Sequence, residues 1–345
     1  MRFRRSRDVL LATALAWFVT APAASQAPRD TIDVLYVGNS YVYVNNLPGL
    51  VEGISAGLDG PLVRGAGHTH GGGTLRGHID DGHLPAIFAR GPAGREGWDW
   101  IVLQEQSTLG TRYDPDTGEL GSPDAFHGAA RELVGRIRAA GAKPALYMTW
   151  AKQPFPAQSE TLSLTYHSIG AELGVPVVGV GEAWAEVLRA RPDFNLYLSD
   201  GSHPNPAGSY LAACVIYATL TGHSPVGAPR EIFGAPWDMA GPVVSAERTV
   251  LVSLTAADAE FLQRIAWKVA GADANTGPPS RVMALTFDDL PYASVDLDEP
   301  GALPRARVVT ASLLRSLAAR GAPVVAFANE GQLGAGLIRG AGQRD

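Results

Sequence analysis

The stretch IDVLYVGNSY, residues 32–41, decides the fold of this chain. Strand-forming residues continue almost without interruption to Val37 and stop at Gly38, Asn39 and Ser40, after which the sequence suits a helix. A short apolar run of this kind is typical of a strand that is buried on both faces of a parallel sheet. It ends either in an ordinary turn or in a serine that the strand presents at its tip.

Predicted strands and helices alternate from this stretch to about residue 220. Further strands are expected at residues 98–104, 143–150 and 175–180. Helices are expected at residues 47–58, 122–141, 159–174, 181–191, 205–221 and 245–272. Strands separated by helices of this length predict βαβ units, and therefore a mainly parallel sheet with helices on both faces. Ligand sites in such sheets lie beyond the carboxyl ends of the strands, where Ser40, Gln104 and Trp150 all fall.

The composition excludes some partners and some chemistry. The 345 residues carry a formal net charge of -6, which provides no basic face, so nucleic acid is not an expected partner. Cys214 is the only cysteine, so no intrachain disulfide can form. Its apolar neighbours predict a buried and inert thiol.

Residues 1–25 have the three parts of a signal peptide. Basic residues 1–8 precede an apolar stretch at residues 9–21, and the small residues Ala23 and Ser25 suit cleavage before Gln26. The apolar stretch is short for a helix that crosses a bilayer, although an uncleaved membrane anchor is the alternative. The expected mature protein is secreted or periplasmic and has no stable membrane insertion after cleavage.

A segment near residue 200 contains a candidate base for Ser40. A serine becomes a nucleophile only when a base removes its proton and a third group orients that base. In LSDGSHPNPAG, residues 198–208, Asp200 and His203 lie just before a predicted helix. At this spacing the carboxylate can fold back onto the imidazole and fix its tautomer. The alternative is that Asp200 and Ser202 cap the helix, and that His203 merely lies nearby.

Several segments supply hydrogen-bond donors for the negative oxygen that develops during acyl transfer. The backbone N–H of Ser40 lies where a strand meets a turn. The bare backbone of the GGG segment, residues 71–73, can approach a ligand closely. VLQEQS, residues 102–107, ends a predicted strand with the side-chain amides of Gln104 and Gln106, which are neutral donors.

Taken together, these motifs resemble the successive blocks of the SGNH (GDSL-like) hydrolase superfamily. The matching blocks are VGNS at residues 37–40, GGGTL at 71–75, VLQEQS at 102–107 and DGSHP at 200–204. The resemblance covers about residues 32–222 and implies a three-layer α/β/α fold. It implies Ser40 as the nucleophile, His203 as the base and Asp200 as its partner. The implied oxyanion hole consists of the Ser40 N–H, a glycine at Gly72 or Gly73, and a side-chain amide.

The sequence departs from the superfamily pattern at two places. Asn39 replaces the usual aspartate before the serine, and QEQS, residues 104–107, replaces the usual Gly-x-Asn-Asp block. The second replacement resembles the Gln-Gly-Glu version found in carbohydrate acetyl-esterase branches, which favours Gln104 over Gln106 as the oxyanion donor. The candidate substrate contacts are Asn39, Glu105, Gln106 and Trp150. The resemblance therefore implies a serine esterase that removes acetyl or other acyl groups from a carbohydrate or a small ester, without a cofactor.

A histidine-rich segment occupies residues 67–83, GHTHGGGTLRGHIDDGH. It contains His68, His70, His78 and His83 together with Asp80 and Asp81. Imidazole and carboxylate groups suit zinc, so a metal site is one hypothesis. The spacing matches no established ligand motif, so the prediction is a glycine-rich, solvated loop over the active site that holds no metal.

The last part of the chain is predicted to be a separate module, residues 281–345, after a linker at residues 271–280. ALTFDDLPY, residues 284–292, resembles the first motif of NodB-type polysaccharide deacetylases, and a predicted helix and strand follow it. The resemblance implies Asp288 as a general base and Asp289 as a metal ligand. No histidine follows His223, so the His-x-x-x-His ligands of that family are missing. The prediction is an incomplete, inactive α/β fragment, and a simple acidic turn is the alternative.

The sequence leaves two other functions open. One is metal-dependent deacetylation of a polysaccharide by the C-terminal module. The other is non-catalytic carbohydrate binding by a degenerate hydrolase fold, against which the intact Ser40, Asp200 and His203 argue.

Overall fold

The structure is a computed structural model that describes residues 30–92, 95–112, 114, 116–238, 241–242, 247–274, 285–290 and 324–328. The expected signal peptide, residues 1–25, lies outside the described residues, as do residues 275–280 of the expected linker. The chain divides into two units, residues 1–275 and 276–345, and each is described by itself. Among the described residues, no helix combines the length and the apolar character needed to cross a membrane.

A five-stranded sheet forms the centre of the first unit, with the order β2-β1-β3-β4-β5. Its strands are β1 (Thr31–Gly38), β2 (Leu62–Thr69), β3 (Trp100–Leu103), β4 (Lys143–Tyr147) and β5 (Val177–Val178). Every pair of neighbours is parallel. The chain runs outward from β1 to β2 and then crosses to β3 on its other side, so the direction of winding reverses between β1 and β3. Ligands of open α/β sheets bind at this reversal, beyond the carboxyl ends of the strands.

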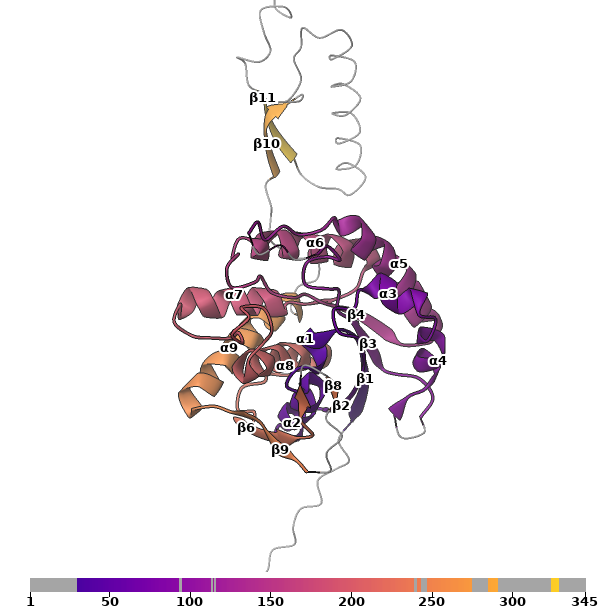
Figure 1. The fold of residues 1–345 in the computed structure, drawn as a ribbon, viewed down its shortest axis with the longest axis vertical. Helices are drawn as coiled ribbons and strands as arrows, with labels where there is room; N and C mark the ends of the chain where they lie inside the picture. Colours follow the sequence, from indigo (N-terminus) through magenta and orange to yellow (C-terminus); the bar gives the residue numbers. More distant parts are fainter. Residues whose placement is uncertain are drawn as a thin grey trace, which may run out of the picture. The chain divides into compact units, whose positions relative to one another are not determined.

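Helices cover both faces of this sheet (Figure 1). One layer contains α3 (Leu75–Asp80), α4 (Leu84–Ala89), α5 (Pro123–Ala139) and α6 (Gln158–Leu173). The other contains α1 (Ser40–Tyr43), α2 (Leu47–Ala56), α7 (Val180–Ala190), α8 (Pro206–Thr221) and α9 (Ala256–Ala274). The prediction of a three-layer α/β/α domain with a mainly parallel sheet is therefore confirmed.

Alternating side chains of β1 build the two cores between these layers. Val34 and Tyr36 point into the core beside α2 and α8, while Leu35 and Val37 point into the core beside α5. Successive side chains of a strand point to opposite faces, so a strand covered on both sides must be apolar at nearly every position. This is why IDVLYV has no polar stripe. Asp33 is the exception, and it is buried in an ion pair with Arg64 at 2.8 Å.

Two elements of the first unit differ from the sequence predictions. The edge strand β2 was not expected, because LVRGAGHT buries only Val63 completely and contains two glycines. The helix predicted at residues 245–272 begins later, since α9 starts at Ala256. Residues Thr249–Ser253 form β9 instead, antiparallel to β6 (Glu231–Gly234). The β-branched residues of TVLVS favour a strand, and a partner strand distant in sequence supplied the hydrogen bonds. A short hairpin of β7 (Trp237–Asp238) and β8 (Gly241–Pro242) lies between them in the chain.

The described part of the second unit is a pair of parallel strands, β10 (Leu285–Leu290) and β11 (Val324–Ala328). Asp288 and Asp289 lie within β10, where the register is irregular between Phe287 and Leu290. The helix predicted between the two strands lies outside the described residues. The resemblance to deacetylases stays a prediction from the sequence.

Candidate active site

Ser40 is the first residue of the one-turn helix α1, directly after the carboxyl end of β1. Asn39 is in extended conformation and caps this helix, because its Oδ1 accepts the Tyr41 N–H at 3.1 Å. The Asn39 carbonyl accepts the N–H of Val42 at 2.9 Å. The turn therefore places the Ser40 hydroxyl at the reversal of the winding between β1 and β3, where the topology predicts a ligand site.

His203 and Asp200 lie on one tight turn before α8. Gly201 sits at the centre of the turn with a φ of +63°, a conformation that glycine adopts without strain. Asp200 Oδ1 accepts the N–H of Ser202 and of His203, both at 2.9 Å. Its Oδ2 accepts the Nδ1–H of His203 at 2.5 Å. The cap of α8 is Asn205, whose side chain accepts the N–H of Gly208, so Asp200 is not needed as a helix cap.

The three side chains form a continuous hydrogen-bonded chain, which we call the triad. His203 Nε2 lies 2.8 Å from Ser40 Oγ. Because Asp200 accepts the proton on Nδ1, the Nε2 atom is left as the acceptor for the Ser40 hydroxyl. Partial burial raises the pKa of Asp200, but hydrogen bonds from the His203 ring and from two backbone amides outweigh it and hold that pKa below its ordinary value. Asp200 therefore stays ionised and orients the imidazole.

Gln104 does not point toward the triad, contrary to the prediction that it donates to an oxyanion. Its side chain is 0% exposed and lies under the turn at Ser40. Its Oε1 accepts the Asn39 N–H at 3.0 Å, and its Nε2 donates to the Glu105 carbonyl at 2.5 Å. The Asn39 donor fixes which end of the amide is the oxygen. Gln104 therefore ties the turn before Ser40 to the end of β3.

Gly73 also has its N–H occupied. This group donates to the His70 carbonyl at 3.0 Å, while the Gly73 carbonyl accepts from Asn39 Nδ2 at 2.9 Å. Gly72 is exposed with a φ of +66°. In the described part of the chain, neither the Ser40 N–H nor the Gly72 N–H has a hydrogen-bond partner. Of the predicted oxyanion donors, these two N–H groups are available, and so is the Gln106 Nε2, because only the Oε1 of that amide has hydrogen-bond partners among the described residues.

The predicted substrate contacts are mostly covered. The Asn39 side chain is hydrogen-bonded to the Tyr41 N–H and to the Gly73 carbonyl. Glu105 is 2% exposed and accepts the Gln106 N–H at 2.6 Å and the Leu75 N–H at 3.3 Å. Burial raises the pKa of Glu105 to about 7, although these two hydrogen bonds lower it. Gln106 is half-buried, and its Oε1 closes the following loop by accepting the N–H of Thr108 at 2.8 Å.

Trp150 supports the turn of His203 from beneath and presents no face to solvent. It is 1% exposed and stacks between Tyr41, at a ring-centroid distance of 4.5 Å, and Trp184, at 4.0 Å. Its Nε1–H donates to the Ser202 carbonyl at 3.0 Å. The prediction of a sugar-stacking Trp150 does not fit this placement.

Sequence reasoning missed a polar cluster next to the triad. The Ser202 hydroxyl lies 2.8 Å from Lys152 Nζ and 2.6 Å from the Tyr41 hydroxyl. Lys152 is buried, which lowers its pKa, and the nearby Asp200 partly opposes this effect. Ser202 lies inside the DGSHP motif and Tyr41 follows Ser40, so proximity to the motifs was the only indication in the sequence.

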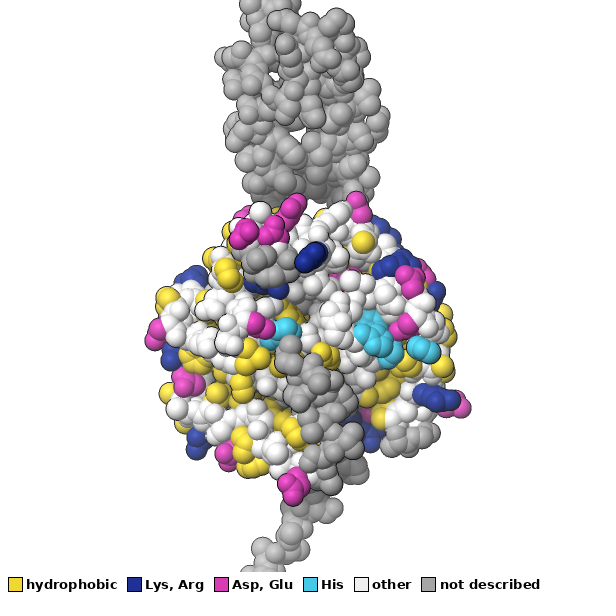
Figure 2. Space-filling model, in the orientation of Figure 1, with side chains coloured by type: hydrophobic (Ala, Val, Ile, Leu, Met, Phe, Trp, Pro, Cys, Tyr) yellow, Lys and Arg dark blue, Asp and Glu magenta, His cyan; other side chains and the backbone are white. Residues whose placement is uncertain are grey.

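The histidine-rich segment contributes to a strand and a helix, whereas the sequence predicted an open, solvated loop. His68 lies in β2 and His78 lies in α3. These two residues come together with His70 and Asp81, and their ligand atoms all lie within 4.8 Å of one another. We call this group the histidine cluster; it does not include His83 or Asp80. Histidine side chains gather on the face of the molecule seen in Figure 2.

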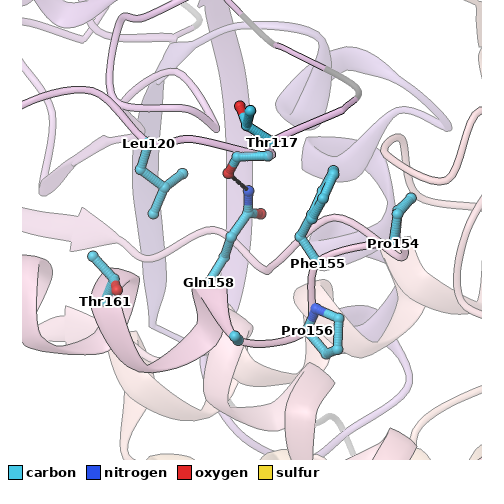
Figure 3. A pocket seen from close by; sticks show the side chains of 9 residues that line it. Thr117, Leu120, Pro154, Phe155, Pro156, Gln158 and Thr161 are labelled. Carbon is cyan, nitrogen blue, oxygen red and sulfur yellow. Dashed lines mark hydrogen bonds between the residues drawn. The ribbon is translucent and has the colours of Figure 1, made fainter.

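A hollow of about 520 Å³ borders the turn of His203, because Pro154 of its lining lies beside Gly201 (Figure 3). It is lined by residues 117–118, Leu120, residues 154–158 and Thr161. Gln158 crosses it to donate to the Gly118 carbonyl at 2.5 Å. None of the triad residues lines this hollow, and it holds no nucleophile with a base beside it.

Comparisons with known proteins find solved structures that are similar to this chain but no matching family. No protein-family model matches the sequence, and no curated protein matches it. A candidate SGNH hydrolase from Slackia heliotrinireducens is 26% identical, over 56% of this chain and 100% of its own, with a TM-score of 0.41. A DUF4886 family protein from Bacteroides uniformis is 19% identical over 70% of this chain and 95% of its own, with a TM-score of 0.49. An acetyl xylan esterase is 16% identical over 54% of this chain and 98% of its own, with a TM-score of 0.41. These TM-scores are low, so the functional assignment depends on the geometry of the site.

Proposed function

We propose that this chain is a serine hydrolase that cleaves carboxylic esters. The observation that carries the proposal is the unbroken chain from Ser40 Oγ to His203 Nε2 at 2.8 Å and from His203 Nδ1 to Asp200 at 2.5 Å. A neutral imidazole in hydrogen-bond contact with a hydroxyl, and itself oriented by a carboxylate, is the arrangement that activates a serine.

The chemistry follows from these contacts. Ser40 Oγ attacks the ester carbonyl while His203 Nε2 takes the hydroxyl proton, and Asp200 stabilises the imidazolium that forms. The negative oxygen faces the N–H groups of Ser40 and Gly72. His203 then gives its proton to the leaving alcohol, which leaves an acyl group on Ser40. A water molecule, deprotonated by His203, releases that acyl group and restores the serine.

We also propose that the substrate is an acylated carbohydrate and that the acyl group is small, such as acetyl. The resemblance of QEQS to the acetyl-esterase version of its block supports this substrate class. The exposure of the site supports a substrate as large as a polysaccharide, because 45% of the Asp200 side chain and 18% of the His203 side chain are open to solvent. An ester group on the surface of a large molecule can reach such a site.

The test is hydrolysis of 4-nitrophenyl acetate by the wild type and by Ser40→Ala. Ser199→Ala is the matched control, since Ser199 is exposed and belongs to the same turn as Asp200. We expect Ser40→Ala to abolish the activity and Ser199→Ala to keep it. Equal rates for all three proteins would discard the hydrolase and favour non-catalytic binding. Release of acetate from acetylated xylan or another acetylated polysaccharide then tests the substrate class.

Export from the cytoplasm completes the proposal, on the grounds of the basic, apolar and small-residue parts of residues 1–25. N-terminal sequencing of the protein expressed with its own leader checks this. A mature terminus at Gln26 supports cleavage, and an intact Met1 contradicts it.

A further inference from the structure

The histidine cluster has the composition and the spacing of a metal site. His70 Nε2 lies 3.1 Å from Asp81 Oδ2, His68 Nε2 lies 3.5 Å from it, and His78 Nδ1 lies 4.0 Å from it. Three imidazole nitrogens and one carboxylate oxygen make a four-ligand set of the kind that zinc takes in tetrahedral sites. Ligand atoms about 2.0–2.1 Å from such an ion are about 3.3 Å apart, so separations in the cluster of up to 4.8 Å must shorten by as much as about 1.5 Å when it binds.

The tautomer of His78 is already set for a metal ion. Its Nε2 lies 2.7 Å from the Gly38 carbonyl, which only accepts, so Nε2 carries the proton and Nδ1 keeps its lone pair. The His78 side chain is 0% exposed, and Nδ1 has no hydrogen-bond partner among the described residues. An imidazole that donates its other N–H to a backbone carbonyl is the usual arrangement of a metal-bound histidine.

His68, like His78, has a buried ring nitrogen without a hydrogen-bond partner among the described residues. This nitrogen is Nε2. Buried polar atoms in native proteins nearly always have a partner, and an ion is one explanation when none is found. The unpartnered nitrogens of His68 and His78 therefore both fit the role of a metal ligand.

We propose that His68, His70, His78 and Asp81 bind one divalent transition-metal ion, with Zn²⁺ as the ion that best fits the ligands. All four ligands come from the protein, so the ion has no open position and its role is structural.

The ion also has a defined connection to the triad. His78 donates to the Gly38 carbonyl, and the His70 N–H donates to the same carbonyl at 3.2 Å. Gly38 precedes Asn39 and Ser40, and the His70 carbonyl in turn holds Gly73. The ion therefore fixes the segment with Gly72 against the turn of Ser40. This second part rests on the proposed function, whereas metal binding itself does not.

The binding test uses the full chain without a histidine tag, stripped by a chelator and dialysed. Zn²⁺ is titrated by calorimetry, and Co²⁺ by the visible absorption of a tetrahedral site. We expect one ion per chain. The variants His70→Ala and Asp81→Asn should bind at least about tenfold more weakly, because each loses one ligand. His83→Ala is the matched control and should bind as the wild type does, since His83 lies in the same segment outside the cluster.

His70 is 52% exposed, so its replacement should not prevent folding. No saturable binding by the wild type would overturn the proposal, and so would unchanged binding by His70→Ala and Asp81→Asn. A loss in His83→Ala as large as that in His70→Ala would show that the ligand set is wrong.

The positioning part is tested by ester hydrolysis with stripped and reloaded protein. We expect a several-fold lower kcat for the stripped protein with little change in KM, and recovery on adding Zn²⁺. Unchanged kcat with an empty site would overturn the positioning role alone. If Ser40→Ala removes no activity, the proposed function fails, yet the calorimetric result still decides the metal site.

Discussion

The triad and the histidine cluster both lie at the carboxyl end of the sheet, and they use imidazole in opposite ways. In the triad, both nitrogens of His203 have partners, a carboxylate on one side and a hydroxyl on the other. In the histidine cluster, His78 has one nitrogen bonded to a backbone carbonyl and the other bare, and the bare nitrogens of His68 and His78 converge. The hydrogen-bond partners of a histidine therefore decide its chemistry. A ring with partners on both nitrogens can transfer a proton, whereas a nitrogen without a partner can bind a cation.

Two consecutive residues directly after β3 each contact the backbone of one of these two regions. Gln104 holds the N–H of Asn39 and so belongs to the triad side. Glu105 holds the N–H of Leu75, the first residue of α3, and so belongs to the side of the histidine cluster. Neither residue reaches solvent, and each orients backbone instead of substrate. Variants at these positions separate the two regions.

The largest expected effect is on catalysis in the triad. We expect His203→Ala to lower kcat/KM for 4-nitrophenyl acetate by about 10³-fold or more, because Ser40 then has no base. His223→Ala is the control, since this exposed histidine lies outside both groups. A loss of less than tenfold in His203→Ala would contradict the difference between the two regions, because His203 would then not act as the base.

The next effect is on the pH dependence of stability through Glu105. Its pKa in the folded protein is raised to about 7 by burial, so folding favours the protonated form. This contribution is complete below the unfolded pKa of about 4.3 and is lost as the pH rises through about 7. Relative to Glu105→Gln, the wild type should lose about 2–3 kcal/mol of unfolding free energy between pH 5 and pH 8. Urea unfolding of both proteins at the two pH values measures this difference, and parallel curves would contradict it.

A smaller effect is expected from Gln104→Met. The substitution keeps the volume and leaves the buried Asn39 N–H without an acceptor, which costs about 1–3 kcal/mol of stability. Urea unfolding measures this loss, and a chelator titration should show that metal affinity is little changed. Full stability with a selective loss of kcat would instead restore Gln104 as an oxyanion donor.

The smallest effect is expected from Ser202→Ala. The hydroxyl connects Lys152 Nζ with the Tyr41 hydroxyl, so its loss should cost about 1 kcal/mol of stability. Both partners make further interactions, which limits the cost. Thermal unfolding measures it. A loss as large as that of His203→Ala in activity would place the Ser202 hydroxyl in the reaction itself.

The sequence predicted the elements whose local and global preferences agree. The apolar run of β1 follows from local residue types, and so does the helix predicted at residues 122–141, which is α5 with Ser122 as its cap. The strand β2 escaped prediction because an edge strand needs little apolar surface. Strand β9 lies inside the range predicted as a helix, because its partner β6 is supplied by tertiary structure.

For the site, the motifs indicated which residues carry functional groups but not which way those groups face. Gln104 and Trp150 stand at strand ends, where a sequence places ligand contacts, yet both turn inward and serve as supports. The histidine cluster was discounted because its spacing matches no motif. Its ligands converge only because β2, which was not predicted, brings His68 beside α3.

The turn from Leu198 to Asn205 has a consequence for how the proposed activity can be lost. Carboxylate and imidazole belong to one small loop that its own backbone hydrogen bonds hold rigid, with the Leu198 N–H on the His203 carbonyl at 2.8 Å. Any displacement of that loop carries the acid and the base along as a single piece. The contact that such a displacement changes is the one between the His203 imidazole and the Ser40 hydroxyl. Variants that loosen the loop should therefore keep the Asp200–His203 contact and lose activity because the imidazole moves away from Ser40.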